Sequence, residues 1–198
     1  MLYNNFESIC LSYLKDKQSL GIMLSGGLDS AVMLYGLCLI KAKHSLPIEF
    51  KVYTVPLHND SQYYARKVVS WINNRFGIKL EHIICGNPNM RHDDVVKSGM
   101  GLAYEQCTYI AIAETTNPPV NLKIGLAPVR TKARVPFQPF IEWTKKETVA
   151  LSIELTLDEL VAQTHSCTED IVRCNLCWQC AERAWGYAEN NYKDPGNF

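Results

Sequence analysis

The chain has 198 residues, of which 47% are hydrophobic and 20% charged, and this composition excludes disordered, collagen-like and fibrous proteins. Its 20 basic and 20 acidic residues give a formal charge of zero, so no overall field attracts the protein to nucleic acid or to an anionic membrane. The sequence has no signal-like start and no apolar run of 18 residues, so we expect a cytoplasmic protein with no membrane partner.

Strands and helices are expected to alternate over the first two thirds of the chain. Helical spacing of apolar residues predicts helices over residues 2–17, 28–40, 61–76 and 101–116. Short apolar runs predict strands over residues 20–24, 50–55, 80–85 and 121–126. Successive β-α-β units of this kind form a parallel sheet with helices on both faces, so we expect an α/β fold.

The last third of the chain differs in character. Residues 144–153 and 157–162 are expected to be helical, a cysteine cluster follows, and a final helix is expected over residues 177–190. We therefore divide the chain into an α/β domain over residues 1–140 and a helical region over residues 141–198.

A glycine turn separates the first expected strand from the helix after it. It consists of Leu24, Ser25, Gly26, Gly27, Leu28, Asp29 and Ser30. At the carboxyl end of a parallel strand, glycines let the backbone approach an anion, and amides at the helix N-terminus donate to it. The turn matches neither the lysine-containing GxxxxGKS/T loop nor the GxGxxG dinucleotide turn. A phosphate or pyrophosphate is the expected ligand; a helix merely capped by Asp29 and Ser30 is the alternative.

Four of the eight cysteines lie within fourteen residues of one another: Cys167, Cys174, Cys177 and Cys180. The two-residue spacings let neighbouring thiolates converge on one ion, and four sulfurs complete a tetrahedral site. We expect structural zinc here, with an iron–sulfur cluster or four unligated buried cysteines as the alternatives. The remaining cysteines lie in apolar contexts and are expected in the core.

Two further segments supply candidate substrate residues. His58, Asn59 and Asp60 follow the second expected strand at the same sheet edge as the glycine turn and are candidates to face the active site. An ordinary turn, with Asn59 and Asp60 capping the next helix, explains them equally well. Arg130, Lys132 and Arg134 follow the fourth expected strand and are able to hold a phosphate or a carboxylate. Basic side chains on an exposed loop are more often simply solvated, which is the alternative for these three.

The glycine turn and three later segments together resemble QueC-type 7-cyano-7-deazaguanine (preQ0) synthases of the N-type ATP pyrophosphatase, or PP-loop, superfamily. The turn matches the SGGxDS loop of that superfamily. The later segments are PFIEWTKKE at residues 139–147, THSC at residues 164–167 and CNLCWQCAER at residues 174–183. The resemblance covers residues 21–30 and 139–183.

This resemblance implies an adenine nucleotide α-hydrolase-like Rossmann fold and cleavage of ATP between its α and β phosphates. QueC-type enzymes adenylate 7-carboxy-7-deazaguanine and, with ammonia, convert it to the amide and then the nitrile, in queuosine or related deazaguanine-modification biosynthesis. The resemblance also implies Mg²⁺, a structural Zn²⁺ and a homodimer. Residues 24–30 would bind ATP, Asp29 would help to position Mg²⁺-pyrophosphate, and Asp29, Ser30 and Lys145 would be catalytic.

Two segments depart from the family pattern. Residues 55–60 read VPLHND where the family has a DYGQ-type segment, and residues 125–132 replace its GxNxxD…YPDCR stretch. Because these segments shape the substrate pocket, three functions stay open: a QueC-type ligase that reaches the nitrile or stops at the amide, a tRNA thiolase, and a non-catalytic nucleotide sensor. The zero net charge and the closed set of four cysteines argue against the thiolase.

Overall fold

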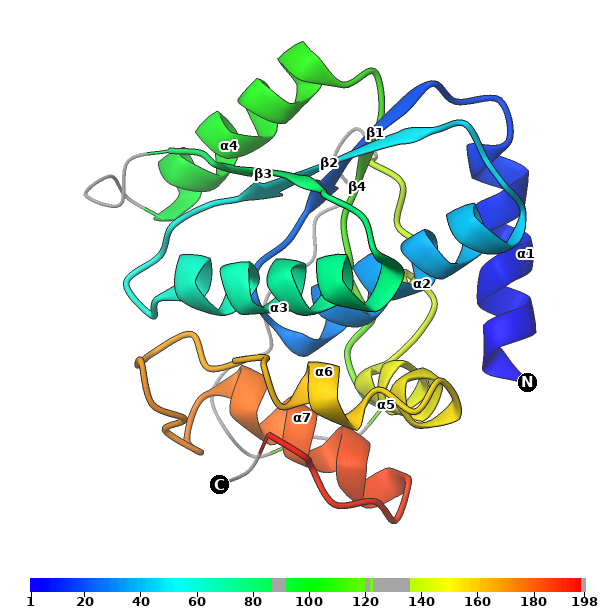
Figure 1. Ribbon diagram of the computed structural model, residues 1–198. Coiled ribbons are helices and arrows are strands. Elements are labelled where there is room, and N and C mark those ends of the chain that lie inside the picture. Colours follow the sequence, from blue (N-terminus) through cyan, green and yellow to red (C-terminus); the bar gives the residue numbers. More distant parts are fainter. Residues whose placement is uncertain (87–91, 120–121, 123–135, 197–198) are drawn as a thin grey trace.

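The protein is built on a parallel sheet, described here from a computed structural model that places residues 1–86, 92–119, 122 and 136–196 (Figure 1). In that part of the chain the sheet has four strands in the order β3-β2-β1-β4. The strands are β1 (Ser19–Met23), β2 (Glu49–Thr54), β3 (Glu81–Ile84) and β4 (Ile110–Ala111). All three neighbouring pairs are parallel, which confirms the predicted α/β class.

Helices cover both faces of this sheet. They are α1 (Leu2–Leu14), α2 (Leu28–Lys43), α3 (Ser61–Phe76), α4 (His92–Gln106), α5 (Lys145–Glu154), α6 (Asp158–Val161) and α7 (Trp178–Glu189). Figure 1 shows α4 on one face, α2 and α3 on the other, and α5–α7 gathered beyond α2 and α3. Among the described helices, none combines the length and hydrophobicity that crossing a bilayer requires.

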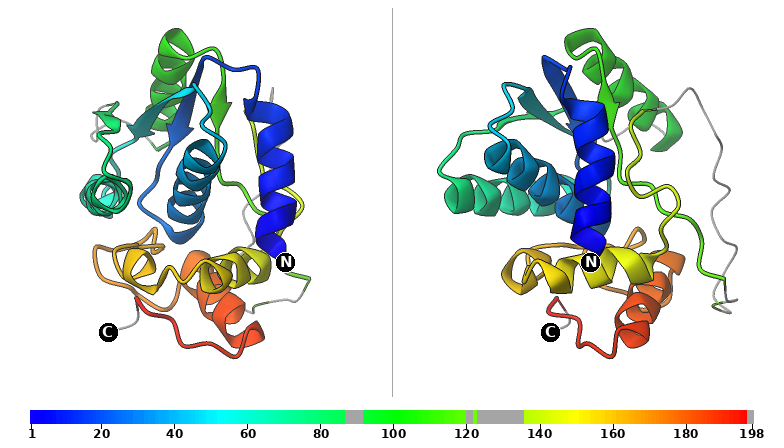
Figure 2. Two further views of the ribbon diagram at one scale, coloured as in Figure 1. Left: turned by 45° about the vertical axis from the view of Figure 1, so that its right-hand side comes forward. Right: turned by 90° about the vertical axis from the view of Figure 1, so that its right-hand side faces the viewer.

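Helix α2 lies at the centre of the hydrophobic core. It is apolar on nearly all sides, and it packs against α1, α3, α5 and α6 as well as under the sheet. Gly36 permits the approach of α1, because a Cβ at this position would lie 2.4 Å from Cε1 of Phe6. Figure 2 shows the N-terminal end of α1 beside α5. At this contact the Leu2 amide donates to Glu154 Oε2 at 2.9 Å.

One predicted helix is too long at its C-terminal end. The helix expected to reach residue 116 ends at Gln106, and β4 follows within the expected helical range. The chain forms a strand here because β2 pairs with one edge of β1 only, and the backbone groups of the other edge need partners. The Gly21 amide donates to the Tyr109 carbonyl, and Ile110 is buried in the core. The strand expected over residues 121–126 lies outside the described residues, except for Leu122.

A buried ion pair fixes the C-terminal segment. Arg183 on α7 is completely buried, and its Nε and Nη2 atoms donate to the two carboxylate oxygens of Asp194, each at 2.8 Å. Arg173 donates to the same carboxylate at 2.8 Å. Burial raises the pKa of Asp194, but hydrogen bonds from Arg183 and its charge outweigh this effect and hold the pKa below its ordinary value. The segment after α7 is therefore anchored to the core through Asp194, whereas residues 191–193 are exposed.

We expect Asp194→Asn to lower the free energy of unfolding at pH 7 by about 3–5 kcal/mol, because Arg183 loses the anion that compensates its buried charge. The native pKa of Asp194 is depressed. Its contribution is therefore fully present above the unfolded pKa of about 3.9 and is lost as the pH falls through the native pKa. Urea unfolding at pH 7 and at successively lower pH measures both effects.

Glu159→Gln is the matched control, since Glu159 is an exposed carboxylate of the same helical region and should change stability by less than about 0.5 kcal/mol. A difference between wild type and Asp194→Asn that stays constant from neutral pH into acid would contradict the assignment.

Candidate active site

The glycine turn lies between β1 and α2, as expected. Gly26 has a φ of 79°, and a Cβ there would lie 2.7 Å from the Ser61 carbonyl oxygen at the start of α3. Only glycine fits this position without displacing α3. Within the turn, Ser25 Oγ and Ser30 Oγ lie 3.1 Å apart, and the Gly27 amide donates to Ser25 Oγ at 3.3 Å. The turn is thus held by its own hydroxyls and seated on α3.

Residues 164–167, at the start of the cysteine cluster, pack against this turn. The His165 amide donates to the Gly26 carbonyl at 2.9 Å, and Ser166 Oγ lies 3.5 Å from the Leu28 amide. Ser166 Oγ also accepts from Arg183 Nη1 at 3.2 Å. The predicted THSC segment therefore contacts the predicted anion-binding loop directly, although 138 positions separate Leu28 from Ser166.

Lys145 reaches the turn from the start of α5. A capping box fixes the beginning of this helix: Thr144 Oγ1 accepts from the Lys146 amide at 3.2 Å, and Glu147 Oε2 accepts from the Thr144 amide at 2.7 Å. The Lys145 ammonium donates to Asp29 Oδ2. It also lies 3.7 Å from Glu182 Oε2 on α7. The structure therefore brings together two residues that the sequence singled out, and adds Glu182.

These groups border a cavity of about 520 Å³. This volume falls within the range of about 300–1,000 Å³ that is typical of small-molecule sites. Every residue of the predicted ATP loop lines it except Gly26, which packs against α3. Its other polar lining residues are Asn59, Glu114, Thr115, Lys145, His165, Ser166, Thr168, Gln179 and Glu182. Its other apolar lining residues are Met23, Tyr53, Val55, Leu57, Val96, Met100, Ile112, Ala113 and Trp178.

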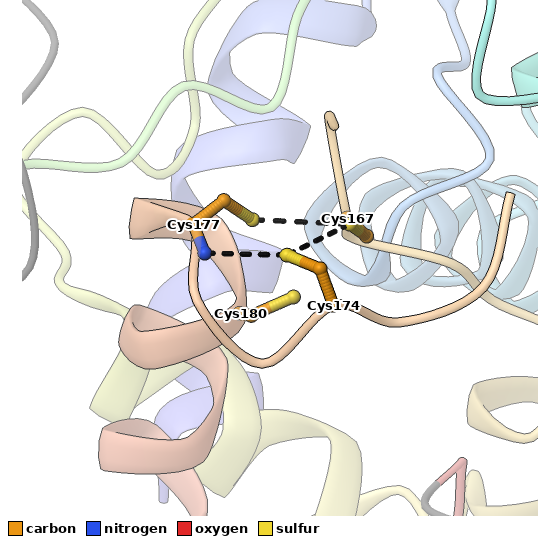
Figure 3. Close-up of side chains that lie close together, drawn as sticks. All are labelled: Cys167, Cys174, Cys177 and Cys180. Atoms are coloured by element: carbon orange, nitrogen blue, oxygen red, sulfur yellow. Dashed lines mark hydrogen bonds between the residues drawn. The ribbon is translucent and has the colours of Figure 1, made fainter. Parts of the chain in front are cut away.

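The side chains of the four clustered cysteines lie close together (Figure 3), and their chain neighbours Ser166, Thr168 and Trp178 line this cavity. Their sulfur atoms all lie within 4.8 Å of one another, with Cys167 Sγ 3.5 Å from Cys174 Sγ and 3.9 Å from Cys177 Sγ. Desolvation raises the pKa of Cys177, but backbone N–H groups of Thr168 and Cys180 outweigh it and lower the pKa to about 7. This arrangement can hold one metal ion, as the spacing of the cysteines predicted.

Neither His58 nor any of the three basic candidate residues is placed at the cavity by the described part of the structure. His58 is exposed and is absent from the lining of the cavity, whereas its neighbour Asn59 is buried and lines it. Asn59 Nδ2 donates to the Cys167 carbonyl at 2.7 Å, so the turn after β2 is tied to the cysteine cluster. Arg130, Lys132 and Arg134 lie outside the described residues.

Three lining residues had no signal of their own in the sequence. Glu182 lies two residues after Cys180, inside the segment that carries the family resemblance, and this position was the one available clue. Glu114 follows β4, the strand that was predicted as helix, and its Oε2 accepts from Gln138 Nε2 at 2.7 Å. Trp178 begins α7, and its Nε1 is buried without a hydrogen-bond partner in the described part of the chain.

We expect Gly26→Ala to destabilise the protein by at least about 1–3 kcal/mol, the cost of a strained left-handed backbone in a residue other than glycine. Overlap of the new methyl group with α3 adds to that cost. Thermal unfolding measures the effect.

Gly27→Ala is the matched control for this change. Gly27 has a φ of −83°, and its Cβ would meet only Ser25 Oγ closer than 3.4 Å. This variant should unfold close to the wild-type temperature. Equal destabilisation by the two substitutions would show that the packing against α3 is not the reason for Gly26.

Comparison with known proteins supports the family resemblance over the C-terminal part. Residues 104–191 match the family model of the queuosine biosynthesis protein QueC. A 7-cyano-7-deazaguanine synthase from Rhodopirellula baltica is 38% identical over 63 residues, which are 29% of this chain and 24% of that protein. The match thus spans about a quarter of that relative's length.

Solved structures share the fold at low sequence identity. A U34-tRNA thiolase from Methanococcus maripaludis has a TM-score of 0.56 at 14% identity, covering 98% of this chain and 75% of that one. An NMN synthetase from Francisella tularensis has a TM-score of 0.52 at 15% identity, with coverages of 79% and 68%. An NAD⁺ synthetase from Burkholderia pseudomallei has a TM-score of 0.53 at 12% identity, with coverages of 96% and 89%. The chain therefore has the adenine nucleotide α-hydrolase-like PP-loop fold, and its C-terminal part carries the QueC sequence pattern.

Proposed function

We propose that this protein is an ATP-dependent ligase of the QueC type. It would adenylate the carboxylate of a deazapurine, and ammonia would then displace AMP to form the amide. The contact between Lys145 and Asp29 carries the proposal. Asp29 belongs to the SGGxDS turn, which lies outside the segment matched to QueC, whereas Lys145 lies inside that segment. Two independent sequence signals thus meet at one point on the wall of one cavity.

The glycine turn is the proposed site of the ATP phosphates. The amides in the first turn of α2 and the hydroxyls of Ser25 and Ser30 are the proposed donors for a pyrophosphate, and the helix dipole favours its negative charge. The loop has no lysine of its own. Lys145 brings the positive charge from α5, where its ammonium can donate to phosphate oxygens as charge develops on the leaving pyrophosphate.

The residues of the turn also fit Mg²⁺. Asp29 Oδ1 is buried and has no hydrogen-bond partner among the described residues, so this carboxylate has an oxygen available to a hard cation. When bound, Mg²⁺ would neutralise phosphate charge between the nucleotide and Asp29. A carboxylate beside a polyphosphate is favourable only with such a cation between them.

The apolar part of the cavity suits a flat heterocycle. Tyr53, Val55, Met100 and Ile112 line it, and apolar walls with a few polar groups are typical of small-molecule sites. Glu114 offers a carboxylate to N–H groups of a guanine-like edge. Because His58 is exposed, we do not propose a substrate role for it. The substrate roles of Arg130, Lys132 and Arg134, the homodimer, the cytoplasmic location and the boundary after residue 140 stay predictions.

The cysteine cluster is proposed to hold zinc. Zn–S bonds of about 2.3 Å in tetrahedral geometry place the sulfurs about 3.8 Å apart. The separations of 3.5 and 3.9 Å from Cys167 Sγ lie on either side of that value, and all four sulfurs lie within 4.8 Å of one another. A multi-iron cluster binds its thiolates through different irons and holds them farther apart. Four ligands leave no open position, so the metal would be structural rather than catalytic.

We expect the purified protein to contain one zinc per chain, measured by elemental analysis. Cys177→Ser should remove it and give an unstable or insoluble protein, because structural zinc contributes directly to the free energy of folding. Cys38→Ala is the control, since Cys38 is a buried core cysteine of α2 and should leave the metal content unchanged. A brown, iron-containing protein would show that the site holds a cluster instead.

We expect the protein with ATP, Mg²⁺, ammonium and 7-carboxy-7-deazaguanine to release AMP and pyrophosphate and to form the amide and then the nitrile. Mass spectrometry follows the heterocycle, and chromatography follows the nucleotide. Asp29→Ala should remove turnover while the protein stays folded and metal-bound, because the turn loses the carboxylate that faces the cation.

Each other outcome identifies a different function. Amide without nitrile means that only the first activation takes place. ADP and phosphate as products would contradict cleavage between the α and β phosphates. ATP binding without any product supports the nucleotide sensor, and sulfur transfer to tRNA would make the protein a thiolase.

A further inference from the structure

Lys145 lies between two carboxylates that come from different parts of the fold. Asp29 belongs to the first turn of α2, and Glu182 to α7. The side chains of Lys145 and Glu182 are each 5% exposed, against 20% for Asp29. An ammonium this deeply buried requires an anionic partner, since an unpaired buried charge is strongly destabilising.

The stem of Lys145 is held in a slot on α7. One turn after Glu182 this helix carries Gly186, where a Cβ would lie 2.7 Å from Lys145 Cγ and 3.0 Å from its carbonyl oxygen. Glycine at this position lets α5 and α7 approach closely enough to confine the aliphatic part of Lys145. The aliphatic part of Lys145 is therefore held against α7, and both carboxylates lie within ion-pair distance of its ammonium.

Lys145 is paired with the carboxylate that the proposed function assigns to Mg²⁺. Asp29 Oδ2 accepts from the Lys145 ammonium, and Asp29 Oδ1 is shielded from solvent. The Lys145 ammonium beside Asp29 repels any Mg²⁺ that approaches this carboxylate. Lys145 must therefore leave Asp29 before the carboxylate is able to serve Mg²⁺.

We propose that Glu182 is a positioning residue, which receives the Lys145 ammonium when Asp29 passes to the Mg²⁺ of bound Mg·ATP. The present separation of 3.7 Å between Lys145 Nζ and Glu182 Oε2 is already within ion-pair distance. A small rotation at the end of the lysine side chain strengthens this pair as the contact with Asp29 breaks. The inference rests on the proposed ATP-binding function, and adds to it the residue that makes the exchange of partners possible.

Glu182→Gln tests the exchange, because it keeps the size of the side chain and removes its charge. We expect calorimetric titration to show Mg·ATP bound about tenfold or more weakly than by wild type, the scale of one lost charge-assisted contact. Binding of ATP in the presence of EDTA should change much less, since Lys145 then has no reason to leave Asp29. Accordingly, a Mg²⁺ titration at fixed ATP should show half-saturation at a higher Mg²⁺ concentration.

Glu189→Gln is the matched control on the same helix. Glu189 pairs with Lys146, the residue after Lys145, at 3.3 Å, and both side chains are exposed. This variant should bind Mg·ATP as wild type does. Glu182→Asp keeps the charge and should recover part of the lost affinity. Zinc content and thermal unfolding of every variant separate a local effect from a loss of fold.

A double substitution decides whether Glu182 acts through Lys145. In a Lys145→Met background, Glu182→Gln should have no further effect on Mg·ATP binding. The inference is wrong if Glu182→Gln weakens binding by the same factor with and without Lys145, or if it has no effect in the wild-type background. Wild-type protein that binds no Mg·ATP would overturn both this inference and the proposed function. Binding without release of AMP and pyrophosphate would overturn the ligase chemistry alone.

Discussion

The ion pair between Lys145 and Asp29 is the contact on which the arrangement of the site depends. It joins the start of α5 to the start of α2, and so connects the sheet domain to the helices that carry the cysteine cluster. The partners of this pair are over a hundred positions apart, yet each is held in place locally: Asp29 by the glycine turn, and Lys145 by a capping box and by the slot at Gly186. Because Lys145 is buried, its ammonium needs an anion beside it, and Asp29 and Glu182 both lie close enough to supply one.

The sequence predicted the parts of the site that are specified by short-range pattern. The SGGLDS turn and the cysteine spacing each bring their groups together within a few residues, so both were recognisable without a structure. Glu182 could not be assigned in the same way, because its role arises from its contact with Lys145, far away in the chain. His58, Asn59 and Asp60 were assigned together to the sheet edge, because proximity to a strand end does not determine which of several adjacent side chains faces inward. The turn buries Asn59 and exposes His58.

The strands show the same limit of local pattern. Four strands were predicted from apolar runs: three of them correspond to β1, β2 and β3, and the fourth, over residues 121–126, lies outside the described residues except for Leu122. The residues of β4 were predicted as helix, because Ile110 and Ala111 are equally compatible with a buried helical turn. Pairing with the second edge of β1 favours the strand over the helix. The local sequence of these residues carries no information about that edge. This error matters for the site, since β4 leads directly to Ile112, Glu114 and Thr115 on the cavity wall.

The burial of Arg183 determines how the protein would respond to truncation after α7. Asp194 lies after α7, in a segment whose other described residues are at least partly exposed. Here a stop codon at position 194 or shortly before it would withdraw an anion from the interior and leave Arg183 facing the hydroxyls of Thr164 and Ser166. Ser166 in turn lies beside the Leu28 amide of the glycine turn. Truncation before Asp194 would therefore disturb the segment, residues 164–167, that contacts the proposed phosphate site.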